Sequence, residues 1–104
     1  MDLRERFGAN VRRARKRHGW SQEELGERCE LHRTEVSLLE RGKRRPQLET
    51  LVKLAGGLGV TPDRLCEGVS WSPATADEKG RLDVVAVPFS SGRVKRPPAP
   101  RPSR

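Results

Sequence analysis

Residues that support catalysis or metal binding are scarce in this sequence of 104 residues. There are two cysteines, two histidines and no tyrosine, and aromatic residues make up 4% of the chain. Cys29 and Cys66 lie far apart without metal-type spacing, and neither His18 nor His32 belongs to an HExxH or CxxC…H pattern. We therefore expect no metal and no cofactor, and we interpret both cysteines as small apolar core residues in a reducing compartment.

Long apolar runs and catalytic patterns are missing as well. No stretch approaches the roughly 20 apolar residues of a membrane span. The N-terminal segment MDLRERFGANVRRARKR lacks the apolar centre of a signal peptide. The sequence shows no Ser/His/Asp spacing and no glycine-rich phosphate-binding loop. These absences predict a cytoplasmic protein that is not an enzyme and does not act at a membrane.

Basic residues, by contrast, are abundant. Charged residues make up 35% of the chain against 33% hydrophobic ones, and 22 Lys and Arg against 14 Asp and Glu give a formal net charge of +8. This surplus favours a polyanionic partner, with nucleic acid ahead of an anionic membrane surface. Composition alone also leaves open that the charge only serves solubility.

The chain divides into two parts of different character. Residues 1–69 contain repeated helical periodicity and form the predicted domain, whereas residues 70–104 are rich in Pro, Ser, Gly and Arg. From Ser90 onward there are five basic residues and no acidic one, so we expect a mostly disordered basic tail. Its one strand-like run is RLDVVAVPF, with a possible short strand at 82–89. That strand has no partner in the sequence, so it either pairs with another protein or packs locally.

Five helices are predicted in the first part, because apolar residues recur there at steps of three and four. Ser21, with Glu24 three residues later, forms a capping box before the second helix. The first three helices are expected at 3–17, 22–29 and 33–41, and TPDRLCEG opens a short fifth one. The fourth lies within RRPQLETLVKLAGGLGV and has a predicted buried stripe of Leu48, Leu51, Leu54, Ala55 and Leu58.

The second and third helices are short and are separated by about three residues, as in a helix-turn-helix. Apolar or small residues stand wherever two steeply crossing helices touch. Gly26 is small at the closest approach and Leu31 fills the turn. The remaining contact positions hold Leu25, Cys29, Val36 and Leu39. This match predicts that 22–41 is a helix-turn-helix unit.

A helical wheel divides the third helix into two nearly opposite faces. Val36 and Leu39 define the buried face, and the outward face holds Arg33, Thr34, Ser37, Leu38 and Arg41. In a major groove, Arg33 can pair with guanine and Leu38 can contact a thymine methyl group. The alternative for Leu38 is that it covers a neighbouring helix or a dimer contact.

The segments SQEEL, LERGKRRPQLETLVKLA and LGVTPDRL occur in the order and spacing of a known family. Over about residues 3–69 the chain resembles the Cro/repressor-type (xenobiotic-response-element-type) helix-turn-helix regulators. This resemblance implies an all-α, compact, lambda-repressor-like domain of five helices. It also implies binding to double-stranded DNA as a transcriptional regulator, usually as a two-fold homodimer, and hence an association with the nucleoid.

The resemblance also assigns roles to individual positions. Gln22 matches a residue that bonds a backbone phosphate, which suits a helix N-terminus. The base-reading positions correspond to Arg33, Thr34 and Leu38, with His32 and Ser37 as neighbours. The loop along the phosphate backbone corresponds to Arg41, Lys43, Arg44 and Arg45. Arg15 and Glu40 match an internal ion pair between the first and third helices.

The sequence departs from the family pattern at the turn and leaves two other roles open. Glu30 replaces the turn glycine, which costs on the order of 1 kcal/mol if the backbone there keeps a positive φ. Glu35 flanks the outward face, where it can accept from a cytosine amino group, pair with an arginine or remain solvated. A third set wraps the first helix and is expected to be mostly solvated, with one residue at most near phosphate: Arg12, Arg13, Lys16 and Arg17.

Together these features predict a sequence-specific regulator that acts by occupying DNA, in the manner of a repressor. The operator, the sign of regulation and the inducing signal are not fixed by the sequence. The alternative is an antitoxin-like, partner-binding module in which residues 70–104 become ordered on another protein.

Overall fold

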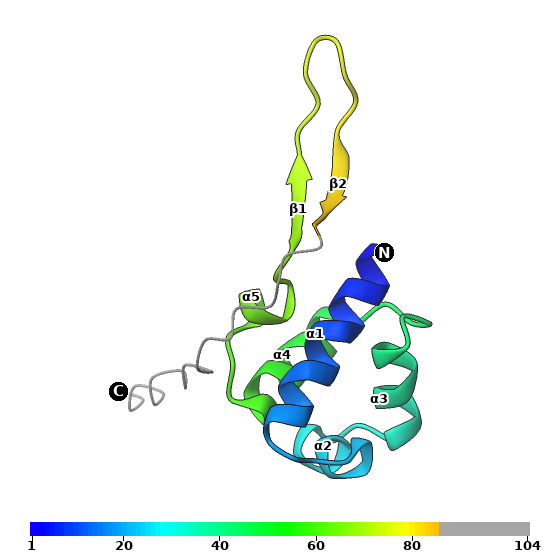
Figure 1. Ribbon diagram of the computed structural model, residues 1–104, viewed down its shortest axis with the longest axis vertical. Helices are drawn as coiled ribbons and strands as arrows, with labels where there is room; N and C mark the ends of the chain where they lie inside the picture. Colours follow the sequence, from blue (N-terminus) through cyan, green and yellow to red (C-terminus); the bar gives the residue numbers. More distant parts are fainter. Residues whose placement is uncertain (86–104) are drawn as a thin grey trace, which may run out of the picture.

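The computed structural model describes residues 1–85 and contains five helices followed by a β-hairpin (Figure 1). The predicted helical helix-turn-helix domain is confirmed, and the third helix ends one residue earlier than expected. The helices are α1 Leu3–Arg17, α2 Gln22–Cys29, α3 Arg33–Glu40, α4 Leu48–Leu58 and α5 Pro62–Leu65. The strands are β1 Val69–Ser72 and β2 Arg81–Val84.

Local signals set where the helices begin. Asp2 accepts a hydrogen bond from the Glu5 amide and caps α1. The capping box before α2 is present: the Ser21 hydroxyl accepts from the Glu24 amide, and the Glu24 carboxylate accepts from the Ser21 amide. These bonds satisfy amide groups that have no partner within the helix.

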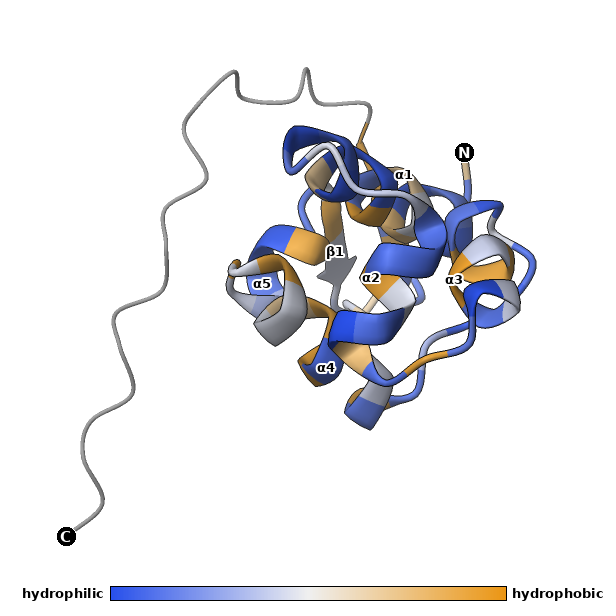
Figure 2. Ribbon diagram, turned by 90° about the horizontal axis from the view of Figure 1, so that it is seen from below, coloured by the Kyte–Doolittle hydropathy of each residue, from blue (hydrophilic) through white to orange (hydrophobic). Residues whose placement is uncertain are grey.

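The hydrophilic residues of α2 lie on the outside of the domain (Figure 2). The hydrophobic core lies where the helices meet. Its most completely buried side chains come from all five helices: Val11, Leu25, Val36, Leu39, Leu54, Leu58 and Leu65. Cys29 is buried and Cys66 half-buried, both as free thiols. Burial raises the pKa of each thiol, which makes neither a ready nucleophile.

One predicted core position is wrong. Leu48 is 77% exposed rather than part of the buried stripe of α4. The C-terminal half of α4 packs closely on α2, since a Cβ on Gly57 would lie 2.4 Å from Cys29 Sγ. The first turn of α4 is far from this contact. Helical periodicity therefore predicted a buried stripe that begins one turn too early, at Leu48.

The prediction of an all-α fold needs a correction. Strands β1 and β2 pair antiparallel, with Val69 opposite Val84 and Trp71 opposite Leu82. The strand-like run therefore has a partner within the chain, and the hairpin crosses the expected boundary between residues 69 and 70. The hairpin projects beyond the N-terminal end of α1 (Figure 1). Residues 86–104, which hold the rest of the expected disordered tail and the second half of 82–89, lie outside the described residues.

Candidate nucleic-acid interface

The two faces of α3 differ sharply in exposure. Val36 and Leu39 are 0% exposed and belong to the core. Arg33 and Thr34 on the opposite face are exposed, while Ser37 and Leu38 are half-buried. The first turn of α3 therefore presents a cation and a hydroxyl to solvent, and Leu38 adds a partly accessible apolar surface beside them.

Close backbone contacts hold α3 against α1 and fix the turn from α2. A Cβ on Gly8 of α1 would lie 2.3 Å from the Leu39 carbonyl oxygen, so only glycine allows this approach. A Cβ on Gly26 of α2 would lie 2.4 Å from the Leu31 carbonyl oxygen. These contacts leave the helix little freedom to rotate about its own axis.

A buried ion pair joins the same two helices. Arg15 Nε donates to Glu40 Oε2 at 2.7 Å, and Arg15 Nη2 donates to Glu40 Oε1 at 2.9 Å. Arg15 Nη1 also donates to the Trp20 carbonyl at 2.8 Å. The hydrogen bond and charge of Glu40 raise the pKa of Arg15 above its ordinary value. The pair expected from the resemblance is present and orients α3.

Gln22 lies at the first position of α2, half-buried, and its side chain is already engaged. Its Nε2 donates to Glu40 Oε1 at 3.3 Å. An amide nitrogen carries two protons, so one donor remains for another acceptor. Gln22 thus links the N-terminus of α2 to the ion pair beneath α3.

His32 has a structural role that the sequence analysis missed. The Thr34 amide donates to His32 Nδ1 at 3.1 Å, which makes His32 the N-cap of α3. The side chain is exposed next to the reading face. Its position immediately before the helix was the available signal, although histidine is not among the favoured N-cap residues.

The loop after α3 is basic and exposed. Its exposed side chains are Arg41, Lys43, Arg44 and Arg45. Arg44 forms an ion pair with Glu35 of α3, so of the three roles considered for Glu35 the structure shows the pairing with arginine. Gly42, at φ 70°, turns the chain here and packs against Glu5.

Glu30 occupies the turn between α2 and α3 in a left-handed conformation, with φ 54° and ψ 44°. Within residues 1–85 it is the only residue other than glycine with a positive φ. The positive φ considered for this turn in the sequence is therefore present although Glu30 is not glycine, at the conformational cost of a side chain in this region.

An aromatic stack supports the approach to α2 and was also missed. The rings of His18 and Trp20 stack with centroids 4.0 Å apart, and the Arg28 guanidinium lies 4.0 Å from the centroid of Trp20. His18 Nε2 further lies 2.7 Å from the Leu58 carbonyl oxygen. Through Arg28 and the Leu58 carbonyl, the stack holds the connection between α1 and α2 against α2 and α4. Gln22 begins α2 directly after this connection.

The part of the chain that the structure describes offers little for other chemistry. Among residues 1–85, no three His, Cys, Asp or Glu side chains are arranged to hold a metal ion. Nor does any helix in that range combine the length and apolarity needed to cross a bilayer.

Comparison with known proteins places this geometry in a family. A family model described as helix-turn-helix matches residues 11–65. Control protein C.BamHI of Bacillus amyloliquefaciens is 40% identical over 67 residues, which are 64% of this chain and 83% of the relative. The restriction-modification controller protein C.AhdI of Aeromonas hydrophila superposes with a TM-score of 0.58 at 38% identity, covering 59% of this chain and 92% of its own. The DNA-binding domain of the P22 C2 repressor superposes with a TM-score of 0.59 at 29% identity, covering 65% of this chain and 88% of its own.

Proposed function

The chain belongs to the Cro/C1-type helix-turn-helix family of DNA-binding transcriptional regulators, and from this premise we propose that it reads the major groove with the first two turns of α3. Arg33, Thr34 and Leu38 contact base edges in this proposal, with Ser37 and His32 beside them. The family is one of regulators and not of enzymes, and the names of the relatives favour this function over a partner-binding module.

One observation supports the proposal above all others: α3 turns Val36 and Leu39 fully inward and leaves Arg33 and Thr34, on the opposite face, exposed to solvent. Arg33 is exposed, and arginine pairs bidentately with guanine O6 and N7. The methyl groups of Thr34 and Leu38 suit the thymine methyl group. The Arg15–Glu40 pair and the glycine contacts hold this face in one orientation.

We propose that phosphate contacts set the register of α3 in the groove. Gln22 has a remaining donor at the N-terminus of α2, where amide groups and the helix dipole favour anions. The loop after α3 supplies the other proposed contacts: Arg41, Lys43, Arg44 and Arg45. Arg44 shares its charge with Glu35, so its phosphate contact is weaker than that of Lys43.

We also propose that the protein binds as a homodimer and represses by occupying its site. Two copies place their α3 helices in successive major grooves, about 34 Å apart. Leu48 and Val52 lie one turn apart on α4, 77% and 56% exposed, and offer an apolar surface to the second copy. Sedimentation of the free protein and of its DNA complex measures the stoichiometry, and one copy per selected site would contradict the dimer. The division into 1–69 and 70–104, the nucleoid location and a protein partner for 70–104 stay predictions.

Selection of bound duplexes from a random pool tests the reading face. We expect a short preferred motif, and Arg33→Ala relaxes the preference at one base step at a cost of about 1–3 kcal/mol. The matched control is Lys43→Ala, which weakens binding to all sequences alike. It lowers the slope of log binding constant against log salt concentration by about one unit. Selection of the same motif with unchanged affinity by both variants would refute the assignment of this face.

A further inference from the structure

The outward side of α1 carries a basic surface that the proposed interface does not use. The other sides of α1 are occupied. Phe7, Val11 and Ala14 face the core, and Gly8 and Arg15 meet α3. Arg6 and Asn10 bond to the chain at α5, through the carbonyls of Leu65 and Glu67. The remaining side, here called the α1 basic face, consists of Ala9, Arg12, Arg13, Lys16 and Arg17.

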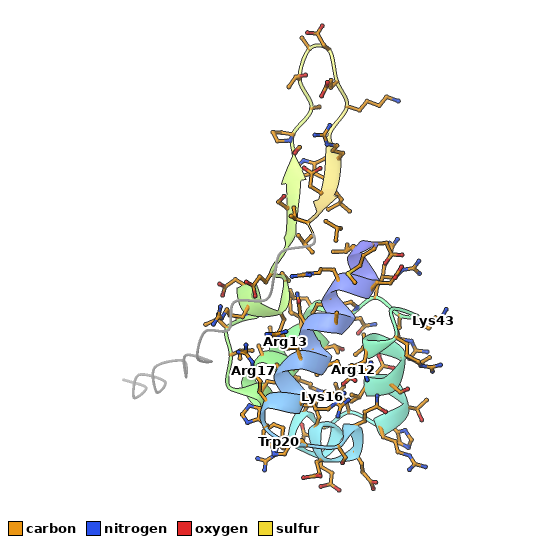
Figure 3. The ribbon with its side chains drawn as sticks, in the orientation of Figure 1. Arg12, Arg13, Lys16, Arg17, Trp20 and Lys43 are labelled. Atoms are coloured by element: carbon orange, nitrogen blue, oxygen red, sulfur yellow. The ribbon has the colours of Figure 1, made fainter. Side chains whose placement is uncertain are left out.

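The α1 basic face is built as two short rows. Arg12 and Lys16 form one row and Arg13 and Arg17 the other, each spaced by one helical turn (Figure 3). Residues in a row are about 6 Å apart along the helix, close to the roughly 6.8 Å that two phosphate steps of one strand advance along the duplex axis. A shallow hollow of about 450 Å³ lies between the rows, with Ala9 at one end. The spacing and the hollow suit a phosphate backbone.

Two cations of this face, Arg12 and Lys16, are not neutralised locally within the described part of the chain. The segment from Arg6 to Trp20 contains no Asp or Glu. Among residues 1–85, Arg12 and Lys16 have no carboxylate within ion-pair distance. Both are exposed. Two cations with no partner inside the described domain are available to an anion from outside.

The face points in a different direction from α3. Around the axis of α1, the centre of the α3 contacts of Gly8 and Arg15 lies about 50° from Arg12 and about 90° from Lys16. Arg13 and Arg17 lie farther round, about 150° or more from these contacts. In Figure 3, Lys43 of the proposed phosphate-binding loop lies at the right edge of the domain, and Arg13 and Arg17 lie farther from it than Arg12 does. A straight duplex held in the groove by α3 therefore does not cover the whole of this face.

We propose that the α1 basic face binds a second segment of duplex DNA through its phosphates, so that one copy of the protein holds two DNA segments. The inference rests on the proposed function, because DNA bound at α3 keeps further duplex at a high local concentration. Charge complementarity identifies the occupant: the face offers cations and little apolar surface, which suits sequence-independent backbone contacts.

A capture assay tests this proposal. A duplex carrying the selected motif is fixed to beads and saturated with protein, and a fluorescent duplex of unrelated sequence is then added. The wild type captures the second duplex, and the double variant Arg12→Gln/Lys16→Gln captures at least tenfold less. The matched control is Lys79→Gln/Arg81→Gln, which removes the same charge from the hairpin and retains capture. Both variants bind the single motif within about twofold of the wild type and keep its circular dichroism spectrum.

Several outcomes would overturn the inference. One is that the wild type captures no more of the second duplex than bare beads do. Another is that the Arg12/Lys16 variant captures as much of it as the wild type. A parallel loss of single-duplex affinity in that variant would place the face on the same duplex as α3. Binding to phosphatidylglycerol vesicles without capture of DNA would assign the face to a membrane. Failure of the proposed function shows separately, as the absence of any selected motif, while capture can still be measured on random duplexes.

Discussion

The Arg15–Glu40 pair provides the sharpest test of how the reading helix is held. In Glu40→Gln the carboxylate is replaced by a neutral amide at a site where Glu40 is 2% and Arg15 11% exposed in the side chain. Two charge-assisted hydrogen bonds, at 2.7 and 2.9 Å, then weaken or are lost. Removing one partner of a buried pair costs about 3–5 kcal/mol, a large part of the roughly 5–15 kcal/mol that stabilises a small domain.

Urea unfolding followed by circular dichroism measures this loss. The double variant Arg15→Met/Glu40→Leu removes both charges and is expected to be less destabilised than Glu40→Gln, because no unpaired charge stays buried. Gln22→Ala removes only the 3.3 Å bond to Glu40, and we expect a cost of about 0.5–1.5 kcal/mol. A change below about 1 kcal/mol in Glu40→Gln would show that the pair does not hold α3 against α1.

The pH dependence of this stabilisation has a definite sign. Glu40 raises the pKa of Arg15 above its ordinary value, which is already strongly basic. A raised pKa means that the Arg15 contribution is fully present below the pKa of the unfolded chain and is lost only as pH rises beyond it. The difference between wild type and Arg15→Met should therefore stay constant from pH 6 to pH 9, and a loss in that range would implicate another group.

Three further predictions follow from single contacts. Glu35→Gln releases Arg44 and removes an anion beside DNA, so affinity rises several-fold and the salt slope steepens by about one unit in binding titrations; unchanged binding would contradict this. Gly8→Ala forces a Cβ against a carbonyl oxygen and should cost about 1–3 kcal/mol. Its control, Gly56→Ala, has nothing within 4 Å and should gain about 0.5–1 kcal/mol; equal effects in urea unfolding would refute the packing argument. Glu30→Gly relieves a positive φ and should raise the melting temperature, and a decrease would show that the Glu30 side chain stabilises the turn.

The helices and the orientation of α3 were predictable because their signals are local. The Ser21–Glu24 capping box and the glycines after α1 and α3 mark boundaries within a few residues. The inward placement of Val36 and Leu39 follows from the helical repeat as soon as α3 is known to pack against its neighbours. These features need no knowledge of distant parts of the chain.

Apart from the His32 N-cap, which is local, the features that were missed depend on contacts between segments that are separated along the chain. Strand β1 reads VSWS, which is too short to stand out, and its partner begins nine residues after it ends. Its pairing becomes visible only when the register Val69–Val84 is formed. The exposure of Leu48 likewise depends on which part of α4 packs against α2. The stack of His18, Trp20 and Arg28 forms only when the connection between α1 and α2 folds back onto α2.

Net charge also shows how little of the site the sequence predicts residue by residue. A formal charge of +8 predicts a polyanionic partner but assigns no role to any single cation. Arg12 and Arg15 are three residues apart on one helix, yet Arg15 is buried against Glu40 whereas Arg12 is exposed and has no ion-pair partner among residues 1–85. Replacing Arg15 should therefore lower stability, and replacing Arg12 should leave stability unchanged and alter only binding to anions. Which cations contact DNA is decided by the helix face on which each one lies, and that face is defined only once α1 has packed against α3 and α5.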